Sequence, residues 1–193
     1  PSELFEVAAE AGRAGELGRI LRAQATEECK QTPIFLNIHP DEFGDGWLVQ
    51  PDDPIFSHPH QVYLEITESV PLRYADVCHS ILKNLRNRGM KLAVDDLGSG
   101  YSNFKSIVDL RPDVVKLDRG LIGGLTKGTR LYRLVTAIVN LCVDMGSKVV
   151  AEGIETEHEL RAVIAAGIHY GQGYLLARPT APPPEYLWPL KKP

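Results

Sequence analysis

The sequence predicts a parallel α/β fold, most simply a TIM-like (β/α)8 barrel of which six strands are present. Short runs of β-branched and aliphatic residues alternate with stretches of helical periodicity along the 193 residues, as in parallel strands joined by helices. A closed barrel needs eight strands. Because the chain opens on a helix, we expect the two missing strands to be N-terminal. An open doubly wound sheet needs no further strands and stays the alternative fold.

The elements are predicted in order from periodicity and turn residues. A first helix is expected because Leu4, Val7 and Ala11 recur at helical spacing. The stretch 41–60, rich in Pro, Asp and Gly, predicts a short helix within irregular loop. Further helices are predicted at 17–30, 73–88, 103–109, 129–146 and 157–166. Strands are predicted at 34–38, 62–66, 91–95, 114–117, 149–152 and 167–170.

The composition predicts a soluble domain with no DNA or RNA partner and no membrane span in this segment. The chain is 44% apolar and 24% charged, with a formal net charge of -4, so DNA or RNA binding, which needs a basic surface, is not expected. No apolar run is long enough to span a bilayer. The three cysteines form no CxxC pair and are expected to be free thiols in a reducing cytosol. We therefore expect a cytoplasmic protein, or the cytoplasmic part of a larger membrane-associated one.

Polar residues lie within or just after successive predicted strands, at their carboxyl ends. They are Asn37, Glu65, Asp95 with Asp96, Lys116, Glu152 and, after the sixth strand, Gln172. One such carboxylate is usually a helix cap or a solvated loop residue. A succession of them at the edge where parallel strands bind ligands predicts a functional site.

The residue types in this set favour metal-dependent phosphoester chemistry. Carboxylate and amide oxygens are hard ligands that suit Mg²⁺ or Mn²⁺ rather than zinc. Adjacent Asp95 and Asp96 could hold two ions, which would activate water for an in-line attack on phosphorus. Lys116 could position that water or stabilise phosphoryl charge. The glycine-bearing loop at 98–102 lacks the ending of a Walker loop and predicts a tight turn or a hinge.

The chain resembles the EAL family of cyclic di-GMP phosphodiesterases. The resemblance runs from the first helix to about Pro179, and its ordered motifs are NIHP, LEITES, AVDDLGSGYSN, VVKLD, VVAEGIET and GQGYLLARP. Two residues depart from the family pattern: His39 stands where a serine-like residue is usual, and Leu97 replaces a phenylalanine. The Glu-Ala-Leu motif itself is absent from the chain, in agreement with the expected deficit of two strands. If the chain were complete, we would expect impaired metal binding and an unclosed barrel.

The resemblance implies a role for each matching residue. Metal ligands would be Asn37, Glu65, Asp95 and Asp96, whereas Glu152, Lys116 and Gln172 would complete the catalytic site. Glu68 would steady the loop from Leu97 to Asn103, and Glu155 would be a supporting carboxylate. Tyr174 and Arg178 are further candidates for contact with the substrate, with surface or packing roles as the alternative.

The resemblance also implies an activity and partners. The activity would be hydrolysis of cyclic di-GMP to linear pGpG with two Mg²⁺ or Mn²⁺ ions. The alternative is a catalytically inactive cyclic di-GMP receptor, and the identity of the Glu-Ala-Leu glutamate would separate the two. The family implies a homodimer, and fused or interacting sensory or diguanylate-cyclase domains. We expect a single EAL-type domain over residues 1–193, N-terminally incomplete.

Overall fold

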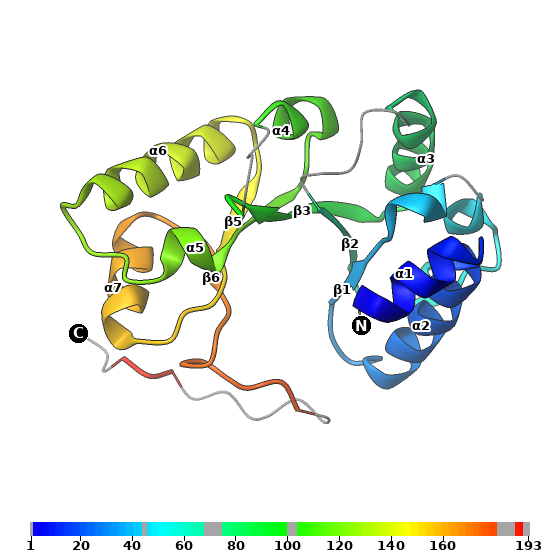
Figure 1. The fold of residues 1–193 in the computed structure, drawn as a ribbon, viewed down its shortest axis with the longest axis horizontal. Helices are drawn as coiled ribbons and strands as arrows, with labels where there is room; N and C mark the ends of the chain where they lie inside the picture. The colour runs from blue at the N-terminus through cyan, green and yellow to red at the C-terminus, as the bar shows by residue number, and fades with distance from the viewer. Residues whose placement is uncertain (1, 44–45, 68–74, 100–103, 181–187, 191–193) are drawn as a thin grey trace. The chain divides into compact units, whose positions relative to one another are not determined.

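The computed structural model describes residues 2–43, 46–67, 75–99, 104–180 and 188–190 (Figure 1). The chain divides into two compact units, Pro1–Ala93 and Val94–Pro193. The boundary falls within strand β3 (Lys91–Leu97), so that each unit contains part of this strand. The interpretation of residues 1–193 as one EAL-type domain stays a prediction.

The first unit packs two N-terminal helices beside parallel strands. Helix α1 (Ser2–Glu10) contacts α2 (Ala14–Glu28), and β1 (Ile34–Asn37) pairs in parallel with β2 (Val62–Thr67). The register places Ile34 opposite Val62 and Asn37 opposite Glu65. The remaining elements of this unit are the 3-10 helices η1 (Pro40–Phe43), η2 (Trp47–Val49) and η3 (Pro54–Ser57), and helix α3 (Ala75–Asn87).

The second unit continues the sheet in the order β3-β4-β5-β6. Strand β4 (Val114–Leu117) pairs in parallel with β5 (Lys148–Ala151), which pairs in parallel with β6 (Tyr170–Gly171). The helices of this unit are α4 (Lys105–Leu110), α5 (Arg119–Ile122), α6 (Arg130–Asp144) and α7 (Glu157–Ala165). Helix α6 packs along β5 (Figure 1).

Apolar faces of strands and helices bury one another in the second unit. All four residues of β4 are buried, which suits a strand covered on both faces. Helix α6 turns Val135, Ile138 and Val139 toward this core, at the spacing of one helical face. Its N-terminus is capped by Thr129, whose side chain accepts a hydrogen bond from the backbone N–H of Tyr132. The core therefore fixes the strands whose ends carry the polar residues.

The six predicted strands are all found among the described residues, and the parallel β/α architecture of the TIM-like class is confirmed. The sixth strand was placed too early, because β6 covers only Tyr170–Gly171. Gly167 instead adopts a positive φ of 81° at the end of α7, and Ile168 packs against the core. The short helix α5 was not predicted, since four residues give too little periodicity to recognise.

Candidate active site

The candidate site in the second unit is built at the carboxyl ends of adjacent strands. Backbone hydrogen bonds extend the ladders one residue past the strands, from Asp118 N to Leu97 O, from Glu152 N to Leu117 O and from Gln172 N to Ala151 O. These bonds align the strand ends, and so bring residues distant in sequence to one edge. The predicted residues of this unit gather there for that reason.

Lys116 lies between two carboxylates in this cluster. Its Nζ is 2.9 Å from Asp95 Oδ1 and 2.7 Å from Glu152 Oε1, and only 7% of Lys116 is exposed. A buried ammonium is costly unless it is paired, and these two contacts supply the pairing. Gln172 Nε2 donates a 2.7 Å hydrogen bond to the same Oε1 of Glu152. Glu152 is thus held from two sides.

Three carboxylates of the cluster are close enough to share a cation. One oxygen each from Asp95, Asp96 and Glu152 lies within 4.8 Å of the others. Burial, together with the neighbouring carboxylates of Asp95 and Asp118, raises the pKa of Asp96. Burial also raises the pKa of Glu152, although the hydrogen bond from Lys116 opposes the shift. Crowded oxygen ligands in partly buried surroundings fit a divalent cation that prefers oxygen.

Asp96 occupies an unusual backbone conformation. Its φ of 59° lies in the left-handed region, which L-residues other than Asn and Asp rarely adopt. Its backbone N–H donates to Asp95 Oδ1 at 3.0 Å. In a regular strand the two adjacent side chains would point to opposite faces, whereas this conformation lets both reach the same cluster.

In the first unit, Asn37 and Glu65 stand opposite each other in the register of β1 and β2. Partners on adjacent parallel strands turn their side chains to the same face. Glu65 is buried, with 5% exposed, and a pocket of about 600 Å³ is lined by both residues together with His39. The His39 ring stacks on Phe5 with centroids 5.5 Å apart. The structure thus groups the site residues of each unit separately.

The supporting residues of the site have different partners. Glu155 forms a 2.9 Å ion pair with Arg119, and the Arg178 guanidinium lies 4.4 Å from the centroid of the Tyr174 ring. Glu68 lies outside the described residues, as does the loop predicted at 97–103 from residue 100 onward.

Glu159 was not singled out from the sequence, yet it shapes the loop after Glu152. Its carboxylate accepts backbone N–H bonds from Gly124, Glu155 and Thr156 at 2.8–2.9 Å. Burial alone would raise its pKa, but these bonds prevail and the pKa of Glu159 is lowered. The signal was present as a capping box, in which Thr156 is followed three residues later by Glu159.

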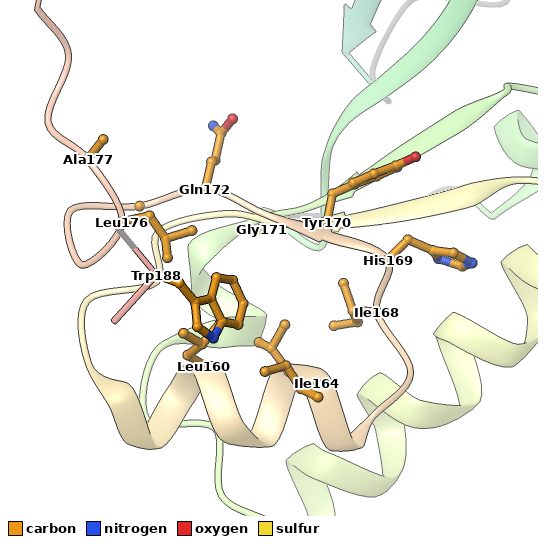
Figure 2. Close-up of a pocket in the computed structure, with 12 residues that line it drawn as sticks. Leu160, Ile164, Ile168, His169, Tyr170, Gly171, Gln172, Leu176, Ala177 and Trp188 are labelled. Carbon is orange, nitrogen blue, oxygen red and sulfur yellow. The ribbon is translucent and has the colours of Figure 1, made fainter. Parts of the chain in front are cut away.

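Gln172 borders two pockets of different character. Figure 2 shows the first, a pocket of about 470 Å³ between α7 and β6 whose wall includes Leu160, Ile164 and Trp188, with Gln172 pointing away from these side chains. The second pocket, of about 490 Å³, is lined by Gln172, Arg119 and Arg178. The first pocket is largely apolar, whereas the second places two guanidinium groups beside the acidic cluster.

All comparisons with known proteins indicate the same family. The EAL domain model matches residues 1–179. A cyclic di-GMP phosphodiesterase of Pseudomonas aeruginosa is 42% identical over 119 residues, which cover 62% of this chain and 20% of that protein. The bifunctional diguanylate cyclase/cyclic di-GMP phosphodiesterase MucR, also of Pseudomonas aeruginosa, is 30% identical over 194 residues, which cover 93% of this chain and 28% of MucR. The chain thus spans less than a third of the length of these relatives.

Among solved structures, the manganese/cyclic di-GMP complex of BlrP1 from Klebsiella pneumoniae superimposes with a TM-score of 0.78. It is 31% identical, and the match covers 93% of this chain and 48% of that chain. The match confirms the fold class that the strand pattern predicted. No described helix is both long and apolar enough to cross a bilayer. The motifs, the fold and the family model agree, and the chain belongs to the EAL domain family.

Proposed function

We propose that this protein hydrolyses cyclic di-GMP to linear pGpG in a reaction that depends on divalent metal ions. The observation that carries the proposal is the cluster of Asp95, Asp96 and Glu152 around Lys116 at the strand ends. Relatives named as cyclic di-GMP phosphodiesterases support the substrate. The manganese/cyclic di-GMP complex of a homologue supports the use of a divalent cation.

Asp95 and Asp96 of the second unit would hold the metal, and Asn37 and Glu65 of the first unit stay predicted as metal ligands. Bound Mg²⁺ or Mn²⁺, as two ions, would supply a water of lowered pKa and neutralise charge on the phosphodiester. We assign the metal ligands on the basis of ligand chemistry, since their oxygens are the type that both cations prefer.

The protein side chains would then position and move protons. Glu152 would accept the proton of the attacking water, because its carboxylate lies in the cluster where the metal and its water would sit. Gln172 and Lys116 both contact Glu152 Oε1, which would fix the carboxylate and leave Oε2 for the water. Lys116 Nζ, which lies within 3 Å of two carboxylates, would donate a hydrogen bond to a phosphoryl oxygen as charge develops there.

The test is turnover of cyclic di-GMP by the full-length protein in Mg²⁺ or Mn²⁺, with pGpG quantified by chromatography. We expect conversion by the unsubstituted protein and a loss of at least about 100-fold in kcat for Glu152→Ala, as for removal of a general base. Glu157→Ala is the matched control, because Glu157 lies exposed on α7 in an ion pair with Arg161. Tight binding without conversion would make the protein a receptor and overturn the enzymatic proposal.

A further inference from the structure

We propose that Arg119 and Arg178 form a second anion subsite, which binds the phosphate of the cyclic dinucleotide that is not being cleaved. The inference rests on the function proposed above and extends it to the other half of the substrate. A cyclic dinucleotide carries two phosphodiester groups, and the acidic cluster with its metal would engage only one of them. Binding of the second group would be favoured by cationic side chains of the protein.

The pocket of about 490 Å³ beside the cluster supplies such cations. Its wall includes Arg119, Arg178 and Gln172, and Gln172 is hydrogen-bonded to Glu152 of the cluster. The pocket and the cluster are therefore neighbours that share the side chain of Gln172. The whole chain has a net charge of -4, whereas the charged residues that line this pocket are two arginines and one glutamate, Glu155.

Arg119 is held in place before any ligand binds. Its aliphatic stem lies against Gly153, where an added Cβ would be 2.6 Å from Arg119 Cγ. Its Nη2 is 2.9 Å from Glu155 Oε1. A guanidinium has five N–H donors, so this ion pair leaves capacity to bind a phosphate oxygen. Gly153 and Glu155 flank Ile154 in the loop that follows Glu152, which ties the position of Arg119 to the cluster.

Arg178 is positioned by an aromatic ring instead of a carboxylate. Its guanidinium carbon lies 4.4 Å from the centroid of the Tyr174 ring, a cation–π contact that orients the group without neutralising its charge. Arginine in such an arrangement is well suited to phosphate, because its planar fork can donate two parallel hydrogen bonds.

The experiment measures the dissociation constant of the full-length protein for cyclic di-GMP in a Glu152→Gln background, where turnover does not interfere. We expect Arg119→Gln and Arg178→Gln each to weaken binding about tenfold, as expected for loss of a charge-assisted hydrogen bond. Arg161→Gln is the matched control, since its side chain is 62% exposed like that of Arg119 and also pairs with a glutamate. This control should bind like the background protein.

A second measurement separates recognition of the remote phosphate from damage to the cluster. With Glu152 intact, kcat/KM is compared for cyclic di-GMP and for bis(p-nitrophenyl) phosphate, which has a single phosphate. We expect the ratio of the two values to fall about tenfold in both arginine variants, because the small substrate cannot reach the subsite. Arg119→Lys should recover part of the ratio, since it retains the charge but not the planar fork.

The outcomes distinguish this inference from the proposed function. Unchanged dissociation constants, or equal losses on both substrates, would show that the arginines do not bind a second phosphate. Binding that weakens in the variants of a protein without turnover would support the subsite and overturn only the hydrolysis. Absence of any binding by the unsubstituted protein would overturn both.

Discussion

At the scale of single residues, Lys116 and Asp96 determine the charge of the candidate site. Lys116 contacts two of the three clustered carboxylates, whereas Asp96 lies beside Asp95 and Asp118 and its pKa is raised. The metal-free cluster is therefore only partly neutralised. A bound cation would relieve the repulsion that remains, and this is the reason that folding and metal binding should be coupled here.

Asp96→Asn should stabilise the metal-free protein while it abolishes metal-dependent turnover. The raised pKa means that the charged form of Asp96 destabilises the fold at neutral pH, so that stability is gained as pH falls through the folded pKa. Asparagine also tolerates the left-handed φ of 59°. Because Asp96 is only partly buried and solvent screens its charge, we expect a gain of at most about 1 kcal/mol at pH 7, measured by urea unfolding in EDTA. Equal stability of variant and parent at pH 7 would contradict this view of the cluster.

The sequence predicted this cluster because each residue stands at the end of a recognisable strand, and strand ends share an edge. It did not reveal Asp118, which caps α5 by accepting from Gly120 N at 2.7 Å, or Arg119, whose partner Glu155 is far away in sequence. An ion pair between loops that are distant in sequence leaves no periodic pattern from which it could be predicted. The roles of the site residues, Glu68 among them, stay predictions.

At the scale of elements, α2 is attached to the η1 and η3 segments by a buried ion cluster. Arg22 is 2% exposed and pairs with Glu42, which is fully buried, and with Asp53 at 2.9 Å. Glu42 also accepts a hydrogen bond from His39 N, two residues after Asn37. The cluster therefore helps to place the end of β1.

Arg22→Leu should destabilise the protein by about 3–5 kcal/mol, because it leaves two carboxylates buried without their cation. Arg19→Leu is the matched control on the same helix. Arg19 pairs with Asp52, which is largely exposed, so its loss should cost much less stability than the loss of Arg22. Chemical denaturation of both variants measures the difference, and similar losses would argue against a special role for the buried cluster.

The segment after β6 is bound by its backbone to the loop after β5. Ile154 N donates to Gln172 O and Leu175 N donates to Ile154 O, both at 3.0 Å. A Cβ at Gly173 would collide with the backbone N and O of Ile154. The close approach that places Gln172 beside Glu152 thus requires glycine at position 173.

Gly173→Ala should therefore displace Gln172 and lower kcat by about 10-fold or more, with a smaller change in KM, since Gln172 orients the proposed base rather than the substrate. Gly167→Ala is the control, because Gly167 has a positive φ but no atom within 4 Å of an added Cβ. The control should lose stability but retain kcat. Steady-state kinetics and thermal unfolding of both variants test whether Gly173 acts through the position of Gln172.

The strands could be predicted from the sequence more accurately than the loops between them. Buried parallel strands have continuous apolar runs, and the runs at 62–66 and 114–117 correspond closely to β2 and β4. Strand β6 has only two residues, and its position depends on hydrogen bonds to β5 rather than on its own composition. Tertiary context of this kind is not visible in a single sequence.

At the scale of the whole molecule, the acidic net charge and the carboxylate cluster predict stabilisation by divalent cations. A cation that binds only the folded state raises the free energy of unfolding by about 2.7 kcal/mol at 100 times its dissociation constant. We expect Mn²⁺ to raise the unfolding temperature above that in EDTA, and Asp95→Asn to reduce the effect. An identical shift in Asp95→Asn would place the responsible cation elsewhere.

The backbone hydrogen bonds of Ile154 also indicate where residues can be inserted without disturbing the site. The spacing between Glu152 and Gln172 is set by hydrogen bonds between β5 and β6 and by the backbone bonds of Ile154. It does not depend on the length of the α7 connection. The connection through α7 can therefore lengthen at its Gly167 turn without altering the spacing of the two side chains. By the same reasoning, a chain cleaved at that turn would keep both halves of the site in register, so we expect this exposed turn to tolerate short insertions.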